Sequence, residues 1–193
     1  MLQTARQFET FLTENKTKGE FYLRNKSVTY VVQAAVIAAL YVVLTLLANA
    51  LGLSSYSIQV RFSEALCILP FFTPAAIPGL WIGCLTANLM TGAIIWDIVF
   101  GSIATLIGAV GTYLLRKHKF ACTLPPVIAN MVIVPWVLRY GYGFKTVYNG
   151  VDWSIPFNVV TVGIGEIISV CILGSLLLKV LNKYRNVIFR GNE

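Results

Sequence analysis

Long apolar runs, separated by short polar segments, extend over most of the chain. A helix that crosses the hydrocarbon core of a bilayer needs about 20 such residues. The run at 58–90 contains Pro70, Pro74 and Pro78, and because proline breaks helices it predicts two helices, the second short for a span. Short helices are tolerated where they line a cavity inside a bundle. The pattern predicts six helices, at about residues 28–51, 58–72, 76–91, 97–115, 122–138 and 155–181.

The composition agrees with this pattern. The chain has 193 residues, of which 57% are apolar and only 12% are charged, and its mean hydropathy is +0.74. A soluble domain of this size cannot hide so much apolar surface, because much of its area must face water. No ten-residue alternating pattern repeats along the chain, so an outer-membrane barrel is not expected. The sequence therefore predicts an all-α integral membrane protein with six transmembrane helices.

The distribution of basic residues predicts the orientation of these helices. With six spans both termini lie on one side of the membrane, and that side holds twelve of the fifteen lysines and arginines. The other side holds only Arg61, Arg139 and Lys145. Because positively charged loops stay in the cytoplasm, we expect cytoplasmic termini, and the net charge of +7 then reflects topology rather than nucleic-acid binding. The connections expected to face outward are residues 52–57, 91–97 and 139–154.

Two polar segments flank the predicted helices. Residues 1–27 carry apolar positions at roughly helical spacing, which is typical of an amphipathic helix on the membrane surface and equally of a frayed tail. A basic tail follows the sixth helix. The expected organisation is a cytoplasmic segment at 1–27, a transmembrane domain at 28–182 and a cytoplasmic tail at 183–193.

Polar side chains at membrane depth gather near the outer ends of the predicted helices, and the inner half has almost none. Glu166 is the deepest, ten residues beyond Pro156 and therefore about 15 Å along the sixth helix. This distribution predicts a polar, aromatic-rimmed pocket that opens outward. The candidate substrate-binding residues are Arg61, Glu64, Asn88, Trp96, Asp97, Trp153, Asn158 and Glu166.

Most of these residues also have a purely structural interpretation. Arg61 and Glu64 are three residues apart and could pair on one helix face, Asp97 could be the N-cap of the fourth helix, and the tryptophans could form an interfacial belt. Glu166 is harder to explain, because a charge at the centre of a membrane helix costs about 2.5–3.5 kcal/mol. No basic residue lies within a turn of it. It must be neutral, paired from another helix or wetted by a cavity, and we interpret it as functional.

Small residues recur at helical spacing in the first, third and fourth predicted helices, which lets helix backbones approach closely. At Gly79 and Gly83, and at Gly101, Ala104 and Gly108, we expect packing within the bundle. The first helix could instead offer its small-residue face to a partner subunit. The partner-coupling candidates are Ala34, Ala35, Ala38 and Ala39.

Several kinds of chemistry are not expected. The sequence has no G-x-x-x-x-G-K-[ST] phosphate loop, so this chain cannot itself drive transport by hydrolysing ATP. It also lacks the G-x-S-x-G and H-E-x-x-H motifs. His118 is the only histidine and the four cysteines are scattered singly, which is not the pattern of a metal site. We therefore expect no enzyme activity, no metal and no cofactor.

Four ordered sequence elements carry a more specific signal. They are Val60–Leu66 continued by Leu69–Leu80, then Ile82-Gly83-Cys84 followed by Ala87-Asn88, then Asp97–Ser102 with Ala104-Thr105-Leu106, and finally Gly163–Glu166. Together, over about residues 26–182, they resemble the QueT family, which are the substrate-binding S components of energy-coupling factor (ECF) transporters. Any one element alone is weak, whereas four with matching order and spacing are a strong signal.

The resemblance implies a six-helix subunit with an outward-facing pocket in the bacterial cytoplasmic membrane. It implies a substrate among the queuosine precursors, which are 7-deazaguanine derivatives. The implied partners are a transmembrane coupling protein and two ATP-binding subunits, and the S component is thought to topple in the membrane to carry substrate inward. The alanine pairs of the first helix resemble the coupling face of S components.

The candidate residues fit such a substrate. A guanine-like edge presents two adjacent donors, N1–H and the exocyclic amine, and one carboxylate can accept both in charge-assisted hydrogen bonds. Either Glu166 or Glu64 could supply that carboxylate, and Arg61 or an asparagine could donate to the neighbouring carbonyl. Three alternatives stay open: an S component for a different small vitamin, a stand-alone secondary transporter, and a membrane enzyme, for which the chain lacks a nucleophile–base pair.

Overall fold

The computed structural model describes the backbone of residues 2–53, 60–118 and 120–184, and their side chains from Lys26 onward. The chain separates into two units, residues 1–32 and residues 33–193, each with its own internal packing. The first unit is the N-terminal part of helix α1 (Leu2–Ala50). Residues 2–27 are therefore helical, and α1 has no break at the predicted start of the first span. The side chains of 1–25, on which the predicted amphipathic face depends, lie outside the described residues.

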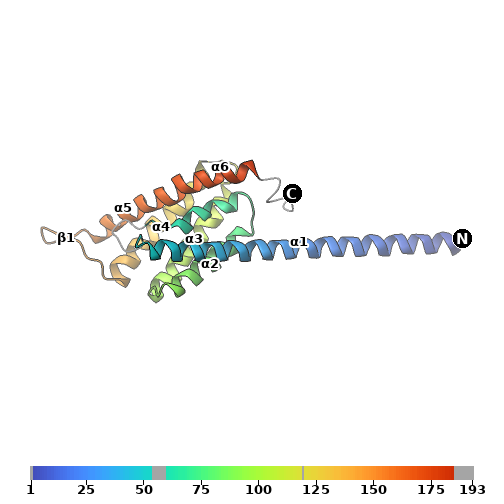
Figure 1. The fold of residues 1–193 in the computed structure, drawn as a ribbon, viewed down its shortest axis with the longest axis horizontal. Coiled ribbons are helices and arrows are strands. Elements are labelled where there is room, and N and C mark those ends of the chain that lie inside the picture. The colour runs from blue at the N-terminus through green and yellow to red at the C-terminus, as the bar shows by residue number, and fades with distance from the viewer. Residues whose placement is uncertain (1, 54–59, 119, 185–193) are drawn as a thin grey trace. The chain divides into compact units, whose positions relative to one another are not determined.

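Helices also make up almost all of the described part of the second unit, as Figure 1 shows. Two of the shorter helical segments are of the 3-10 type, η1 (Phe62–Phe71) and η2 (Ala121–Thr123), and two are π-helices, η3 (Val137–Gly141) and η4 (Ile167–Gly174). The α-helices that follow α1 are α2 (Ala76–Met90), α3 (Ile95–Leu114), α4 (Leu124–Trp136), α5 (Ser154–Glu166) and α6 (Ser175–Lys183).

Four helical stretches in the described residues are long and apolar enough to cross a bilayer: Lys26–Ala50, Ile95–Leu114, Ala121–Gly141 and Ser154–Lys183. The last two are composite, because η2, α4 and η3 follow one another directly, as do α5, η4 and α6. Their bounds agree with the predicted first, fourth, fifth and sixth helices. The chain is thus an all-α membrane protein, while a total of six spans and the position of the termini stay predictions.

The second predicted helix differs from the structure in type and in length. Instead of an α-helix at about 58–72, the chain forms the 3-10 helix η1, which contains Pro70. At about 2.0 Å per residue its ten residues extend about 20 Å, nearly as far as the predicted α-helix of 15 residues. Residues 63–70 are all buried. Backbone of unusual geometry is tolerated at membrane depth when protein surrounds it, and the burial of residues 63–70 meets that condition.

The two ends of the second unit are identified by contacts between the helices. At one end the Thr73 hydroxyl donates to Gln33 Oε1 at 3.0 Å, the Thr112 hydroxyl donates to the Cys122 carbonyl at 2.9 Å, and Leu178 packs in a buried cluster with Cys122. At the other end the α2–α3 turn and the α4–α5 connection meet. The turns predicted to face outward, so far as the structure describes them, therefore do share one end of the unit.

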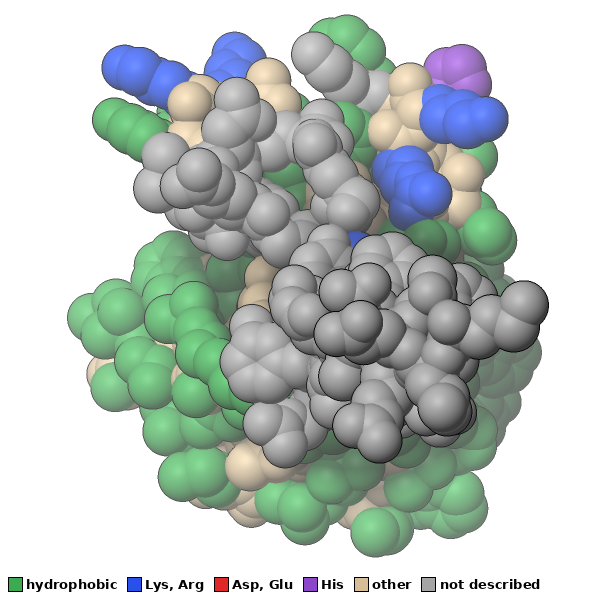
Figure 2. Space-filling model, turned by 90° about the vertical axis from the view of Figure 1, so that its right-hand side faces the viewer, with side chains coloured by type: hydrophobic (Ala, Val, Ile, Leu, Met, Phe, Trp, Pro, Cys, Tyr) green, Lys and Arg blue, Asp and Glu red, His purple; other side chains and the backbone are tan. Residues whose placement is uncertain are grey.

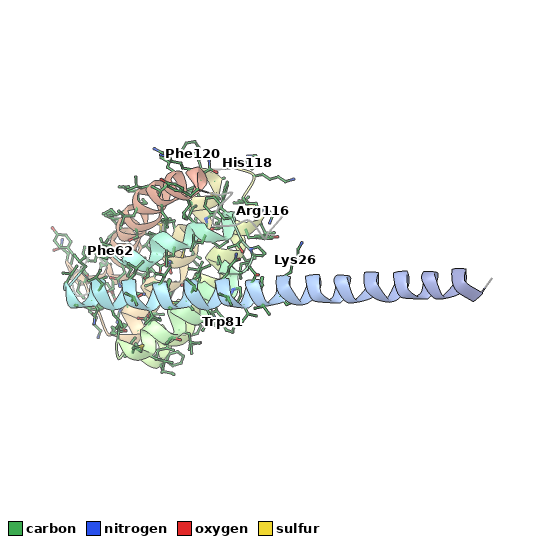
Figure 3. The ribbon with its side chains drawn as sticks, turned by 45° about the vertical axis from the view of Figure 1, so that its right-hand side comes forward. Lys26, Phe62, Trp81, Arg116, His118 and Phe120 are labelled. Atoms are coloured by element: carbon green, nitrogen blue, oxygen red, sulfur yellow. The ribbon has the colours of Figure 1, made fainter. Side chains whose placement is uncertain are left out.

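Figure 3 places Arg116 and His118 toward the opposite end from this shared turn region. Figure 2 shows Lys, Arg and His side chains along one edge of the molecule, with hydrophobic side chains covering much of the rest of this face. In Figure 3 Phe62, the first residue of η1, lies toward the other end of the bundle from Arg116. This arrangement agrees with the charge asymmetry expected from the sequence.

The four alanines of the first helix that are predicted to couple to a partner fall into two groups. A Cβ added at Gly79 would lie 2.7 Å from the Ala34 carbonyl oxygen, and one at Gly83 would lie 3.0 Å from the Ala38 Cα. These close approaches show that α1 packs on α2 through small residues on both helices. Ala34 and Ala38 are therefore engaged within the chain. The other pair, Ala35 and Ala39, is exposed.

The α4–α5 connection, predicted as a loop at 139–154, contains a β-hairpin. Strand β1 (Val147–Tyr148) pairs antiparallel with β2 (Val151–Asp152). The two residues between them, Asn149 and Gly150, have φ angles of +50° and +77°. Two left-handed residues in succession, with the sequence Asn-Gly, form the tight hairpin turn whose twist matches the flanking strands.

Candidate functional site

A polar cavity of about 260 Å³ lies at the end of the second unit where the turns meet. It is formed by the end of α1, the residue before η1, the α2–α3 turn, the last turns of α4 and the start of the α4–α5 connection. Its size is just below the range of about 300–1,000 Å³ that is usual for drug-sized ligands, so it suits a small molecule. The lining residues are Thr45, Asn49, Arg61, Asn88, Thr91, Gly92, Ala93, Asp97, Val134, Leu138, Tyr142 and Phe144.

Asp97 is the centre of the polar contacts in this cavity. Arg61 Nη2 lies 3.7 Å from its Oδ2, and the Tyr142 hydroxyl donates to the same oxygen at 3.0 Å. Asn88 Nδ2 donates to the Asp97 backbone carbonyl at 3.3 Å. A Cβ at position 101 would lie 3.0 Å from Asp97 Oδ1, so Gly101 leaves the room in which this carboxylate sits.

Two structural interpretations of the sequence are thereby wrong. Arg61 pairs with Asp97 of α3 and not with Glu64 along its own segment. Asp97 lies inside the first turn of α3, whose N-cap is Ile94 and has no side-chain capping bond. An acidic side chain there is favourable beside the helix N-terminus.

Partial burial and the neighbouring Asp97 carboxylate raise the pKa of Tyr142 above its usual value, so that its hydroxyl remains a donor.

Glu64 is buried next to the cavity and has partners for both carboxylate oxygens. The Tyr41 hydroxyl donates to Oε1 at 2.5 Å, and the Cys67 thiol donates to Oε2 at 3.1 Å. Residues three apart eclipse one another in a 3-10 helix, which places Arg61, Glu64 and Cys67 along one face of η1. The Tyr41 bond reaches this face from α1, and beside it the Thr45 hydroxyl contacts the Ser63 hydroxyl at 2.8 Å.

Glu166 lies at the end of α5, within electrostatic range of Glu64 and Arg61 and alongside Asn130 of α4. Its Oε2 atom is buried and has no hydrogen-bond partner among the described residues. The same holds for Nδ2 of Asn130 and Nδ2 of Asn158. The π-helix η4 begins at the next residue, and π-segments inside helices are frequent at functional sites.

Chemically, the two groups of residues form one continuous polar region. Arg61 joins them, because it pairs with Asp97 in the cavity and lies within electrostatic range of both glutamates. The region offers carboxylate acceptors, amide donors and one guanidinium. It can therefore recognise a ligand that presents adjacent donors and an acceptor.

The two candidate tryptophans lie apart from this region. Trp96 is 58% exposed and stacks on Phe100 with ring centroids 5.9 Å apart. Together with Trp136 it lines a separate, apolar groove of about 500 Å³ on the outside of α3 and α4. Trp153 is also exposed and lines neither space. Both residues are thus exposed, as the interpretation of an interfacial belt requires.

Of the other predicted residues, the structure brings Arg61, Asn88 and Asp97 into the cavity, and Glu64 and Glu166 beside it. Asn158 is buried on α5 but lines neither space. The polar lining residues Thr45, Asn49, Thr91 and Tyr142, and the Glu64 partner Tyr41, were not singled out from the sequence. Tyr41 lies within an apolar run, and threonines are common in membrane helices, so neither type stands out. The contact between a tyrosine and a buried carboxylate can be recognised only from the packed arrangement of the helices.

The connection after α4 also holds a local polar network that fixes the start of α5. Arg139 Nε donates to Asp152 Oδ2 at 3.0 Å, and the Ser154 backbone N–H donates to Oδ1 at 2.9 Å. Hydrogen bonds from the hydroxyl and backbone N–H of Ser154, together with Arg139, lower the pKa of Asp152 to about 2. Arg139 therefore ties the hairpin to η3, and Asp152 in turn holds the first residue of α5, the helix that carries Glu166.

Comparison with known proteins assigns the chain to a family. The family model described as "QueT transporter" matches residues 31–183, most of the chain. The chain belongs to the QueT transporter family. A curated relative in this family, the "Queuosine precursor transporter QueT" of Lactococcus lactis subsp. cremoris (strain MG1363), is 37% identical over 96 residues. The match covers 49% of this chain and 56% of the relative, so the chain spans about half the length of that protein. No solved structure matches significantly.

Proposed function

We propose that this chain is the substrate-binding membrane subunit, an S component, of an ECF transporter, and that it captures a queuosine precursor from outside the bacterial cytoplasmic membrane. Membership of the QueT transporter family supports a transport role, and the name of the similar Lactococcus protein supports the substrate class. The polar cavity at the end where the outward-facing turns gather provides an entry for such a substrate.

The observation that carries the proposal is the set of buried polar atoms without partners. Among the described residues, Glu166 Oε2 is a buried acceptor without a well-formed hydrogen bond, and Nδ2 of Asn130 and Nδ2 of Asn158 are buried donors without one, although the Asn130 amide lies close enough to Glu166 to stabilise its carboxylate. A buried polar group left unpaired costs about 1–3 kcal/mol, and a ligand that completes these bonds removes that cost. The guanine edge of a 7-deazaguanine has adjacent donors for a carboxylate and a carbonyl for an amide. Glu166 is the preferred carboxylate, since both oxygens of Glu64 already accept hydrogen bonds from the protein.

Delivery of the substrate would depend on partners. Because the sequence has no phosphate-binding loop, we assign ATP hydrolysis to two separate subunits and docking to a transmembrane coupling protein. The exposed Ala35 and Ala39 of α1 are the part of the predicted coupling face that remains available. In this proposal all six helical stretches lie in the membrane, with η1 and α2 as the short ones and both termini in the cytoplasm.

Binding and identification of the ligand test this function directly. The purified chain should retain a 7-deazaguanine derivative that mass spectrometry identifies, and should bind it in calorimetric titration. A 7-deazaadenine of similar size is the matched control, because its edge presents an acceptor where guanine presents a donor, and it should bind at least tenfold more weakly. Equal binding of both bases would contradict the assigned recognition, and copurification of an unrelated vitamin would indicate a different S component.

Reconstitution distinguishes the subunit from a stand-alone transporter. Vesicles that contain only this chain should accumulate little or no substrate. Vesicles that also contain the coupling protein and the ATP-binding subunits should accumulate it in an ATP-dependent manner. Substrate uptake by the chain alone, driven by an ion gradient, would contradict the S-component assignment.

A further inference from the structure

The outside of α3 and α4 carries an apolar groove of about 500 Å³ that the proposed function does not use. Its walls are aromatic. On α3 the ring of Trp96 stacks on Phe100 with centroids 5.9 Å apart, and on α4 and η3 the ring of Trp136 stacks on Tyr140 with centroids 6.0 Å apart. Each pair is four residues apart, the spacing that places two side chains on one face of a helix. Aliphatic side chains of α4 and η3 complete the lining.

The groove lies on two helical stretches that are long and apolar enough to cross a bilayer, Ile95–Leu114 and Ala121–Gly141. The side chains that line it have few polar atoms, namely the indole N–H groups of Trp96 and Trp136 and the hydroxyl of Tyr140. Water does not fill such a space, because a buried water molecule needs about two to four polar partners. We therefore expect an apolar molecule of the membrane as the occupant.

The length of the groove agrees with the hydrocarbon layer of one leaflet. Val132, which lines it, comes eight residues before Tyr140, and this separation corresponds to about 12 Å along a helix. The hydrocarbon core of a bilayer is about 30 Å thick, so one leaflet supplies about 15 Å. Val132 marks the deep end, while Trp96 and Tyr140 lie toward the turns between the helices. One acyl chain fits this length, whereas a spanning helix of a partner would extend well beyond it.

The mouth of the groove suits a polar headgroup. Tryptophan and tyrosine are enriched at the membrane–water interface, and Tyr140 is 70% exposed. The Arg139 guanidinium carbon lies 5.4 Å from the centre of the Tyr140 ring. Its Nε and Nη2 atoms pair with Asp152, and the Nη1 edge can bind a phosphate oxygen in a charge-assisted hydrogen bond. An apolar groove with a cation at its mouth complements the charge distribution of a phospholipid.

The groove and the polar cavity lie on the two sides of one wall. The Tyr142 hydroxyl bonds Asp97 on the cavity side. On the groove side Gly141 lets η3 approach the start of α3, because a Cβ at this position would lie 3.6 Å from the Trp96 Cβ. A molecule in the groove therefore supports the wall from behind. Three pairs of consecutive residues form the wall, with one member lining each space: Trp96 and Asp97, Val137 and Leu138, and Gly141 and Tyr142.

We propose that this groove binds one acyl chain of a phospholipid, taken from the leaflet on the side of the turns, and that the bound lipid stabilises the wall shared with the polar cavity. The aromatic and aliphatic lining binds the chain by removing its methylene groups from other surroundings, and Arg139 binds the phosphate. The lipid is a structural ligand. Its site depends neither on the transported molecule nor on partner subunits.

Lipid retention by the unmodified chain tests this proposal. The chain is purified in a mild detergent, stripped of lipid and titrated with dioleoylphosphatidylglycerol. Native mass spectrometry should show one phospholipid that binds and saturates at a lower concentration than any further lipid. Retention of no phospholipid, or of detergent or free fatty acid in preference to it, would overturn the proposal.

Tryptophan fluorescence identifies the position of the first lipid. A phospholipid brominated in the middle of its acyl chains quenches the indole rings that it contacts. In Trp81→Phe/Trp153→Phe only Trp96 and Trp136 remain, and their fluorescence should fall in step with binding of the first lipid. Trp96→Phe/Trp136→Phe is the matched control, and its remaining tryptophans should not respond to that lipid. Equal quenching of the two pairs would indicate lipid spread over the surface and would overturn the proposal.

A variant that narrows the groove separates this site from the rest of the apolar surface. Val132→Trp should weaken binding of the first lipid at least about tenfold, as expected when the groove loses room for two methylene groups. Val160→Trp is the matched control, because Val160 on α5 is 58% exposed, Val132 is 61% exposed, and Val160 lines neither space. Added phospholipid should raise the thermal unfolding midpoint of the stripped parent and of Val160→Trp, but not of Val132→Trp. Equal lipid affinity in the two variants would overturn the assignment to this groove.

Two other occupants would give different results. If a second copy of the chain covers the groove, the purified protein is a dimer that Val132→Trp dissociates. If a partner subunit covers it, Val132→Trp leaves lipid retention unchanged and reduces assembly of the complex. Either result would overturn the lipid proposal and leave the proposed transport function standing. Retention and quenching with native Val132 decide the case if Val132→Trp does not fold.

Discussion

The hydroxyl of Tyr41 on α1 donates a hydrogen bond to Oε1 of Glu64 on η1, with 2.5 Å between the two oxygens. Both side chains are almost fully buried, at 1% and 2% exposure. The bond sets the position of η1 against the first helix, and it also fixes the carboxylate that lies beside Arg61 and Glu166. One contact therefore contributes to both the packing of the unit and the geometry of the site.

Tyr41→Phe removes this donor and should destabilise the protein by about 1.5–3 kcal/mol, the usual range for a hydrogen bond to a charged group. Thermal unfolding in detergent measures the change. Tyr140→Phe is the matched control, because Tyr140 is 70% exposed, and it should leave the midpoint unchanged. A Tyr41→Phe protein as stable as its parent would show that Glu64 does not depend on this bond.

Gly83→Ala and Ala35→Leu separate packing within the chain from contact with a partner. The added Cβ at position 83 would lie 2.8 Å from the Tyr41 Cβ, and such overpacking typically costs about 1–3 kcal/mol. Ala35 is exposed, so Ala35→Leu should keep stability and ligand binding but reduce transport by the reconstituted complex. Unfolding in detergent and uptake in vesicles are the two measurements. Full transport by Ala35→Leu would remove Ala35 from the coupling face.

Cysteine labelling tests the orientation in the membrane. Lys145→Cys, in the α4–α5 connection, should react with a membrane-impermeant maleimide added to intact cells, whereas Lys117→Cys, after α3, should be protected. The native Cys67, Cys84 and Cys122 are buried, and Cys171→Ser removes the remaining partly exposed thiol, so the background should be low. The reverse labelling pattern would place the polar cavity on the cytoplasmic side and contradict capture from outside.

Glu166→Gln should weaken binding of a 7-deazaguanine ligand at least tenfold. Glutamine keeps the size of the side chain but replaces one acceptor by a donor, and losing a charge-assisted bond costs about 1.5–3 kcal/mol, with each 1.4 kcal/mol equal to tenfold. Glu64→Gln should have the smaller effect, because both of its oxygens are engaged by the protein. Calorimetric titration measures both variants. If both variants stay monodisperse and bind the ligand within about threefold of the parent affinity, neither carboxylate forms hydrogen bonds to the base edge.

The hairpin before α5 should respond to acid in a defined window. The pKa of Asp152 is lowered to about 2, below the value near 3.9 of an unfolded aspartate. The carboxylate therefore contributes its stabilisation above about pH 4 and loses it as the pH falls through about 2. Hydrogen exchange of the amides at 147–154, corrected for intrinsic rates, should accelerate over this window. In Asp152→Asn the exchange should already be fast at pH 4, and parent-like protection there would contradict the role of this carboxylate.

The sequence by itself determined the class of the protein, most of its helices and its family. The predicted spans at 28–51, 97–115, 122–138 and 155–181 correspond closely to the helical stretches of the structure. This is possible because the bilayer sets the length and apolar character of a span locally, residue by residue. The Asn149-Gly150 turn of the hairpin was also readable from its two residues, although the connection was expected to be a loop.

The partners of the polar residues were decided only by the tertiary structure. Proximity in the sequence suggested Arg61 with Glu64, but the ion pair formed with Asp97, 36 residues away. Four alanines looked alike in the sequence, and packing against Gly79 and Gly83 divided them into an engaged pair and an exposed pair. Hydrogen bonds and ion pairs depend on which helices are neighbours and on which side chains lie at the same depth along the bundle. That is a property of side-chain volumes summed over the whole bundle, which no local stretch of the chain contains.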